Sequence, residues 1–240
     1  MTVKISKKEV GRVLAGYLEE ARRLRAARKD APYPEDWTQL KAWQSNRLAN
    51  THADLLANER YRPAAEFFLS DLYGPKDFSP RDDEMARVLP LMTNMLPVSA
   101  LVALIDAIRM DALSESLDDD MVSALRRVNT STGHLDSISY VSYAEAYRHC
   151  GRASDRKLQI ALVDKIGRAL DALTRLPMLY ATLKLMRIPA EVAGLGNLQS
   201  VLQHGFEAFR HMGPAGEFLD KVTERETHFM EGLVACDSHT

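Results

Sequence analysis

The sequence predicts an all-α protein, a single-domain bundle of about nine to eleven helices. Leu and Ala together account for 60 of the 240 residues, whereas Val and Ile account for only 21. This balance favours helices over strands, because β-branched side chains lose rotamer freedom in a helix. Apolar residues also recur at helical spacing, between prolines and glycines that divide the chain into segments. With 27% charged and 46% hydrophobic residues, the composition is that of a globular domain.

Three helices are predicted in the first third of the chain. The first extends to about Lys29, and Ser6 and Glu9 have the spacing of a capping box at its start. Two prolines then end this helix, because a residue before proline is forced out of helical geometry, and a second helix begins near Glu35. Pro63 suits the first turn of a third helix.

The middle third is predicted to contain three further helices. Ser79 and Pro80 fit the N-cap and the first position of one of them. Pro97 begins an apolar helix that ends before three consecutive aspartates, 118–120, and a shorter helix follows them. The polar segment 129–133 is predicted to be a loop.

The C-terminal part of the chain is predicted to form five helices. Their approximate ranges are 137–150, 154–175, 177–188, 190–210 and 215–233, separated by Gly151, Pro177, Pro189, and Gly213 with Pro214. The helices 154–175 and 177–188 are apolar on nearly all sides, which is typical of buried helices. We therefore expect this pair at the centre of the bundle, one domain over residues 1–235, and a disordered tail over 236–240.

The net charge of −2 conceals an uneven distribution. Residues 1–30 carry nine Lys and Arg against four acids, whereas residues 71–120 carry four Lys and Arg against eleven acids. Such opposite charges either attract one another within the fold or remain available to a partner. The basic N-terminal helix, which includes Arg22, Arg23 and Arg25, is therefore a candidate surface for a protein partner or a second copy of the chain. Nucleic acid is not favoured, because the pI is about 6.4 and no aromatic residues alternate with these charges.

Several classes of protein do not fit the sequence. The two cysteines, Cys150 and Cys236, cannot supply a disulfide framework for a chain of this length. The first thirty residues lack the apolar stretch of a signal peptide. The uncharged stretch 88–105 contains two prolines, which interrupt a helix before it reaches the roughly 20 apolar residues needed to cross a bilayer. These features predict a cytoplasmic protein without a membrane segment.

Three stretches of the sequence resemble a family of uncharacterised bacterial proteins. They are FFLSDLYGPKDFSPRD at 67–82, SYAEAYRHCGR at 142–152 and AGLGNLQSVLQHGFEAFR at 193–210. The function of that family is unknown. The resemblance therefore implies a helical bacterial domain and supplies no catalytic residue.

Glu145 and His149 form the first candidate pair for binding a ligand. They are four residues apart and so lie on one side of a helix, which is how helical bundles present carboxylate and imidazole groups to iron, manganese or zinc. A solvent-facing surface pair is the alternative for Glu145 and His149, and similar combinations at 204–211 and 224–228 are expected to face solvent as well, because the apolar residues of their helices lie on other sides. We predict no metal site, and the sequence identifies no cofactor.

Glu226 is a second kind of candidate, because it falls within an apolar stripe of its helix. A carboxylate there needs a partner or has a raised pKa. We expect an arginine partner, with Arg187 and Arg210 as the candidates, and we include all three residues among the possible ligand-binding groups. Tyr143 is included as well, since the tyrosines of its helix either line a pocket or pack in the core.

No predicted set of residues has the pattern of a catalytic site. Helix caps, turns and apolar packing account for most of the sequence, so we predict a non-catalytic interaction or regulatory module. The alternative is a ligand-binding protein or metal-dependent enzyme with an internal pocket, similar to the heme-oxygenase-like helical bundles. This alternative is an analogy at the level of the fold.

Overall fold

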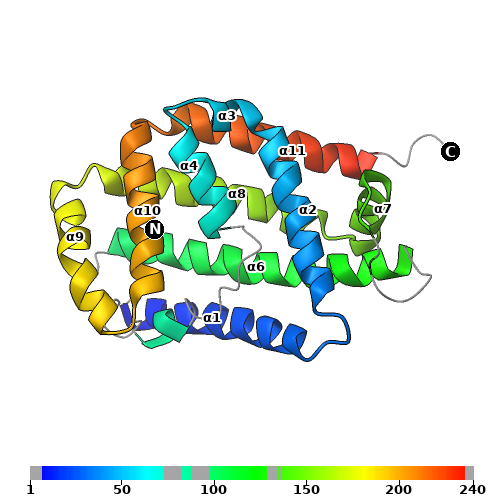
Figure 1. Ribbon diagram of the computed structural model, residues 1–240, viewed down its shortest axis with the longest axis horizontal. Coiled ribbons are helices and arrows are strands. Elements are labelled where there is room, and N and C mark those ends of the chain that lie inside the picture. The colour runs from blue at the N-terminus through cyan, green and yellow to red at the C-terminus, as the bar shows by residue number, and fades with distance from the viewer. Residues whose placement is uncertain (1–6, 73–82, 88–97, 129–134, 136, 236–240) are drawn as a thin grey trace, which may run out of the picture.

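The chain folds into helices that are arranged around one long helix, α6 (Val98–Val128) (Figure 1). The computed structural model describes residues 7–72, 83–87, 98–128, 135 and 137–235, and this part of the chain contains no β-strand. At 1.5 Å per residue, the 31 residues of α6 span about 46 Å. Four helices pack directly on it, namely α1 (Lys7–Lys29), α2 (Glu35–Thr51), α7 (Tyr140–Cys150) and α8 (Ala153–Thr174). The predicted all-α fold is confirmed.

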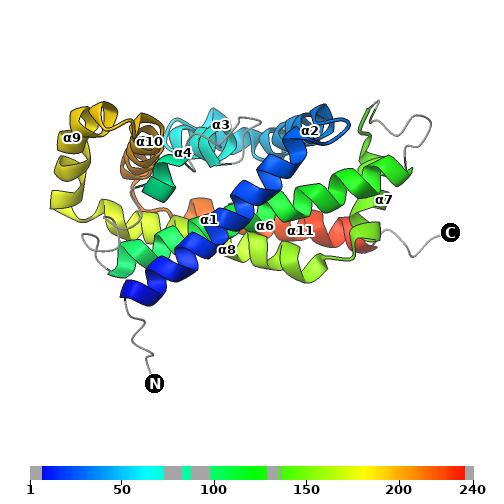
Figure 2. The ribbon, with the colours of Figure 1, turned by 90° about the horizontal axis from the view of Figure 1, so that it is seen from below.

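The remaining helices pack mainly on α8 and on one another. They are α3 (Ala53–Ala57), α4 (Arg62–Phe67) with the π-helical turn η1 (Phe68–Leu72), α9 (Pro177–Val192), α10 (Gly196–Met212) and α11 (Gly216–Ala235). α11 contacts α8 and α7, whereas α10 contacts α4, α8 and α9. Both views of the ribbon place α9 at one end of the molecule (Figures 1 and 2).

Most predicted helix boundaries agree with the structure. α2 begins at Glu35, and Pro63 occupies the first turn of α4. α7 begins after Ser139, whose side chain forms a reciprocal capping box with Ser142, and it ends at Gly151 with a left-handed φ of 61°. The predicted features at Ser6, 79–80, Pro97, 129–133 and 236–240 lie outside the described residues.

The predicted break at the three aspartates is wrong, because α6 continues through them. Asp118 is buried, Asp119 accepts hydrogen bonds from Arg28 and Trp37, and Asp120 accepts one from Arg152. Aspartate has only a modest intrinsic cost within a helix, and cationic partners on neighbouring elements offset it here.

Pro189 was also expected to separate two helices, but it lies inside α9. The helix ends instead near Gly194, which has a left-handed φ of 68°. Gly196 then begins α10, so the helix boundary lies at Gly194–Gly196, inside the helix predicted over 190–210.

The predicted central pair of helices is wrong as well. Four apolar side chains of α9 are largely exposed, with 76% for Met178, 78% for Leu185, 68% for Ile188 and 86% for Val192. The apolar character of α9 on several sides did not mean that each side has a partner. α6 occupies the centre in its place, and α8 packs beside it.

The uneven charge of the sequence is largely neutralised between α1 and α6. Arg25 and Arg28 are buried, and both pair with Glu115, to which Lys41 also donates at 2.7 Å. Burial acts to raise the pKa of Glu115, but Lys41, Arg28 and Arg25 outweigh it and hold this pKa below its ordinary value. Two of the arginines in the basic cluster therefore bind the fold itself and are not at a free surface.

The buried apolar side chains of the described residues form four clusters. One joins α2, α6, α7 and α11 around Leu125, and a second joins α3, α4, α10 and α11 around Phe209. A third joins α1 to the first half of α6 around Leu14, and a small fourth joins α6 to α8 around Ile166. No helix in the described ranges is long and apolar enough to cross a bilayer.

Candidate functional site

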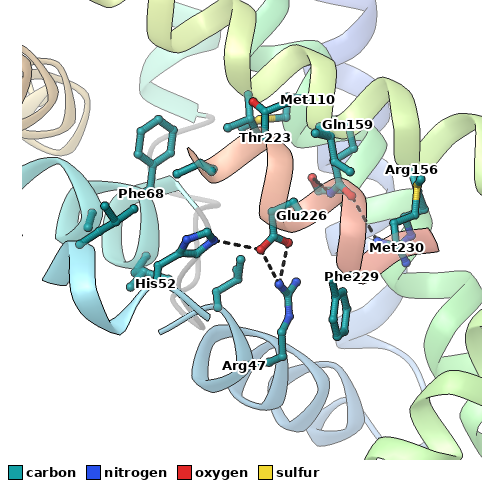
Figure 3. A pocket seen from close by; sticks show the side chains of 18 of the residues that line it. Arg47, His52, Phe68, Met110, Arg156, Gln159, Thr223, Glu226, Phe229 and Met230 are labelled. Carbon is teal, nitrogen blue, oxygen red and sulfur yellow. Dashed lines mark hydrogen bonds and ion pairs between the residues drawn. The ribbon is translucent and has the colours of Figure 1, made fainter. Parts of the chain in front are cut away.

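A cavity of about 140 Å³ lies between three of the four apolar clusters and is lined by residues of each (Figure 3). Side chains from α2, α3, α4, η1, α6, α7, α8 and α11 line it. Most of the lining is apolar and includes Leu55, Phe68, Met110, Ile160, Phe218 and Phe229. An apolar cavity of about 150 Å³ is large enough for a benzene molecule.

Glu226 of α11 lies on the wall of this cavity and is bound by two residues from the C-terminal end of α2. Nη1 of Arg47 donates to both carboxylate oxygens at 2.6 Å, and Nε2 of His52 lies 3.0 Å from Oε1. The Arg47 guanidinium also stacks over the ring of Phe229, 4.2 Å from its centroid. We refer to Arg47, His52 and Glu226 as the polar cluster.

The polar cluster keeps Glu226 ionised. Burial acts to raise the pKa of Glu226, but the hydrogen bond from His52 and the charge and hydrogen bonds of Arg47 outweigh burial and lower it. The carboxylate is therefore charged at neutral pH, and it neutralises Arg47 within the cavity wall.

Two polar atoms of the cluster have no hydrogen-bond partner among the described residues, although both are buried. They are Nε of Arg47 and Nδ1 of His52. Buried polar atoms in proteins are nearly always paired with protein, water or a ligand, and leaving one unpaired costs about 1–3 kcal/mol. The cluster thus retains hydrogen-bonding capacity beside an apolar cavity.

Arg156 and Tyr147 form a second polar region of the wall. Arg156 is buried, its guanidinium lies 5.2 Å from the ring centroid of Tyr147, and its Nη1 donates to Gln159 at 3.3 Å. Gln159 in turn donates to Ser114 at 2.7 Å. In Figure 3, Arg156 lies on the opposite side of Glu226 from Phe68. Arg156 and Phe68 therefore belong to different parts of the cavity wall.

Tyr147 is also part of the cavity wall. Burial raises the pKa of Tyr147 to about 12, and Arg156, Arg47 and Glu226 are all close enough to affect it. The phenol is therefore neutral at physiological pH and able to donate a hydrogen bond. Within the described part of the chain this hydroxyl has no hydrogen-bond partner.

Two of the six predicted ligand-binding residues line the cavity. Glu226 contributes its carboxylate, and Tyr143 contributes part of the wall while its hydroxyl accepts a hydrogen bond from Gln44 at 3.3 Å. The ring of Tyr143 stacks on Trp43 with centroids 4.1 Å apart. Tyr143 is thus both a core residue and a cavity residue.

Glu145 and His149 do not line the cavity. His149 is exposed, and its Nδ1 bonds to the backbone carbonyl of Glu145 at 2.9 Å. This contact uses the backbone of Glu145 and not its carboxylate, so it is a local interaction of α7. No three His, Cys, Asp or Glu side chains in the described ranges lie close enough together to hold a metal ion.

The predicted arginine partners of Glu226 are wrong. Arg187 is exposed on α9 and lies 3.7 Å from Glu191, whereas Arg210 is exposed on α10 and stacks over Tyr180. The prediction that Glu226 has an arginine partner is nevertheless correct, since Arg47 binds it. His52 is buried and bonded to the same carboxylate.

Arg47, Arg156 and Tyr147 were not identified as site residues from the sequence. Arg47 and Arg156 lie on amphipathic helices, where an arginine usually faces water, and nothing in the spacing marks these two as buried. Tyr147 is one of the tyrosines of α7 that were expected to line a pocket or pack in the core, and it does both.

One comparison with known proteins identifies a family. Residues 23–240 match the family model described as a domain of unknown function, DUF8198. No curated protein and no solved structure matches the chain.

Proposed function

We propose, for a chain that belongs to the DUF8198 family of unknown function, that the central cavity binds a small organic molecule. In this proposal the protein is a non-catalytic module whose stability or partner binding responds to that ligand. The observation that carries the proposal is a largely apolar cavity whose wall includes two residues, Arg47 and His52, that each have a buried polar atom without a hydrogen-bond partner among the described residues.

The apolar part of the wall supports a ligand with a compact apolar body. Phe68, Leu55 and Phe218 come from three different helical segments and all line the cavity. A volume of about 140 Å³ suits one six-membered ring with a small substituent.

The polar part of the wall supports a hydrogen-bond acceptor on that body. Arg47 and Arg156 have only donors to offer, and the neutral hydroxyl of Tyr147 can donate as well. Glu226, the acidic group of the wall, already accepts hydrogen bonds from Arg47, so the donors of the wall favour a carboxylate or a carbonyl over an amine. An aromatic carboxylate is the simplest molecule with both properties.

A panel of single-ring compounds tests the proposal. Benzoate, benzamide, toluene and benzylammonium are added to the purified chain, and binding is measured by ligand-observed NMR and by the shift in melting temperature. Benzoate and benzamide are expected to bind and benzylammonium is not. At ten times its dissociation constant a ligand stabilises by about 1.4 kcal/mol, which corresponds to a rise of roughly 3 to 5 °C for a chain of this size.

Two variants assign the binding to the cavity. Val163→Phe fills part of the cavity and is expected to abolish binding, whereas Val141→Phe, at a position that is 72% exposed on α7, leaves it intact. Tyr147→Phe keeps the shape of the cavity wall but removes the hydroxyl, and it is expected to weaken the binding of benzoate more than that of toluene. The proposal is wrong if no compound of the panel binds, or if Val163→Phe binds benzoate as well as the wild type does.

Other predictions from the sequence stay predictions. A bacterial origin, a cytoplasmic location and one domain over 1–235 are consistent with the fold but are not required by it. A partner for the basic N-terminal helix is not part of the proposal, because Arg25 and Arg28 are buried against α6. No specific feature of the described residues favours the metal-dependent enzyme.

A further inference from the structure

α9 carries an uninterrupted row of exposed apolar side chains on its outer side. Met178, Leu185, Ile188 and Val192 are each more than two-thirds exposed, and the smaller Ala181 between them is exposed as well. Exposed apolar residues that occur singly need no explanation, but a continuous row on one helix marks an interaction surface. We refer to these five residues as the α9 seam.

The opposite side of α9 is fixed to the rest of the fold. Tyr180 stacks on Phe206 of α10 with ring centroids 5.7 Å apart, and Gln199 of α10 donates to the carbonyl of Leu183 at 2.6 Å. α9 is therefore held in place, and the exposure of the seam is a consequence of this packing. Its position at one end of the molecule leaves room for a partner (Figures 1 and 2).

The spacing of the seam indicates what kind of partner fits it. Positions 178, 181, 185, 188 and 192 alternate steps of three and four residues, which is the repeat of a coiled coil. A helix with this repeat packs best against another helix with the same repeat. A second copy of α9 supplies that helix without any additional component.

The charges beside the seam favour an antiparallel pair. With Leu185 assigned to position a of the heptad, Lys184 and Glu191 both occupy position g. In an antiparallel pair position g faces position g of the other helix, so Lys184 of each copy faces Glu191 of the other. In a parallel pair position g faces position e, where the residues are Thr182 and Pro189, and no opposite charges meet.

The side chains needed for these contacts are at the surface. Glu191 is 58% exposed and lies 3.7 Å from Arg187, beyond the length of a strong hydrogen bond. Lys184 is exposed and lies over the ring of Tyr180. Both charges can therefore reach across a helix pair, and a twofold axis forms the same contact twice.

We propose that two copies of the chain associate through the α9 seam as an antiparallel pair of helices, with Lys184 of each copy facing Glu191 of the other. The contact centres on one helix of 16 residues per copy, so the interface is small. The dimer is expected to be weak, with a dissociation constant in the micromolar range, and to form independently of the cavity.

Sedimentation velocity over protein concentrations from low micromolar to several hundred micromolar tests the proposal. The wild type is expected to shift from monomer to dimer across this range. Leu185→Glu is expected to remain monomeric and to melt at the wild-type temperature, because Leu185 is 78% exposed. Val141→Glu, at a similarly exposed position on α7, is the matched control and is expected to dimerise normally.

A charge exchange tests the orientation. Lys184→Glu and Glu191→Lys are each expected to weaken the dimer about tenfold, because each places like charges opposite one another twice. The double variant restores opposite charges and is expected to recover the wild-type dissociation constant. The proposal is overturned if the wild type stays monomeric, which includes the case in which another segment of the chain covers the seam. It is also overturned if the Leu185→Glu variant still dimerises, or if the double variant dimerises no more tightly than the single variants.

Discussion

The carboxylate of Glu226 and the imidazole of His52 lie 3.0 Å apart in the wall of the central cavity, although 174 residues separate them in the sequence. Nη1 of Arg47 lies 2.6 Å from each of the two oxygens of the same carboxylate. This contact joins the end of α2 to the middle of α11. It therefore links the stability of the fold to the polar wall of the proposed binding site.

Replacement of Glu226 by Gln is expected to lower the free energy of unfolding by about 2 kcal/mol at pH 7, because Arg47 then lacks a buried negative partner. The folded pKa of Glu226 is below its ordinary value of 4.5. The stabilisation of the fold by the ionised Glu226 is therefore complete above pH 4.5, and it is lost as the pH falls through the folded pKa. Urea unfolding of both proteins at several pH values should show a difference in the free energy of unfolding that shrinks as the pH falls below 4.5.

Glu224→Gln is the matched control for this prediction. Glu224 lies on the same helix but is exposed, so its replacement is expected to change stability by less than about 0.5 kcal/mol. A Glu226→Gln variant that is as stable as wild type at neutral pH would contradict the role of the polar cluster.

Neutralising each of two carboxylates that lie three residues apart on α6, Glu115 and Asp118, is expected to change the stability of the fold in opposite directions. Lys41, Arg28 and Arg25 surround Glu115, so Glu115→Gln is expected to cost about 3 kcal/mol at pH 7. Burial and the charge of Glu115 raise the pKa of Asp118, whose buried Oδ1 has no partner in the described structure. Asp118→Asn is therefore expected to raise stability at pH 7, by up to about 1 kcal/mol.

The pH dependence of these two variants follows from the same shifts. The raised pKa of Asp118 makes the ionised carboxyl unfavourable in the fold, so the gain from Asn appears as the pH rises above 3.8 and vanishes below it. The loss from Glu115→Gln instead shrinks as the pH falls below 4.5. Thermal unfolding at several pH values measures both. Equal effects of the two substitutions would refute the assignment of charges to this network.

Gly205 permits the close contact between α10 and α4. A Cβ atom at this position would lie 2.6 Å from Cζ of the buried Phe67, so Gly205→Ala is expected to destabilise by about 1–3 kcal/mol despite the better helix propensity of alanine. Gly232 lies in α11 with no atom within 4 Å of an added Cβ. Gly232→Ala is therefore expected to stabilise by about 0.5–1 kcal/mol. Chemical denaturation of both variants tests the prediction. It requires that the free energy of unfolding falls in Gly205→Ala and rises in Gly232→Ala.

Replacing each of the two buried tyrosines of α7 by phenylalanine is expected to have different effects on the stability of the fold. The hydroxyl of Tyr143 accepts a hydrogen bond from Gln44, so Tyr143→Phe is expected to cost about 1 kcal/mol. Tyr147→Phe removes a hydroxyl that has no partner within the described residues, and it should leave the melting temperature unchanged or raise it. A large loss of stability in Tyr147→Phe would show that this hydroxyl already has a partner and would remove it from the proposed ligand contacts.

Helix boundaries could be predicted wherever the signal is local. Pro63 and Gly151 mark the ends of elements through their own backbone geometry, and the structure agrees at both. Pro189 did not end its helix, and the aspartates 118–120 did not break α6. The aspartates depend on partners such as Arg28 and Arg152, which lie on elements that are distant in sequence.

The candidate site could be predicted only in part for the same reason. Glu226 was visible because an acid within an apolar stripe is unusual, and its need for an arginine followed from electrostatics. Arg47 and His52 could not be assigned to it, because the packing of α2 on α11 depends on how all the helices between them are arranged. Arg187 and Arg210 were equally plausible in sequence, and the structure places both at the surface.

The sequence by itself determined that the chain is helical and where most helices begin and end, because each helix satisfies its backbone within a few neighbouring residues. Only the tertiary structure decided which side chains are covered. It buried Arg25 and Arg28 against α6, left the α9 seam exposed, and kept a cavity between three apolar clusters. Burial depends on which distant surfaces meet, and a pattern of apolar residues along one helix does not specify its partners.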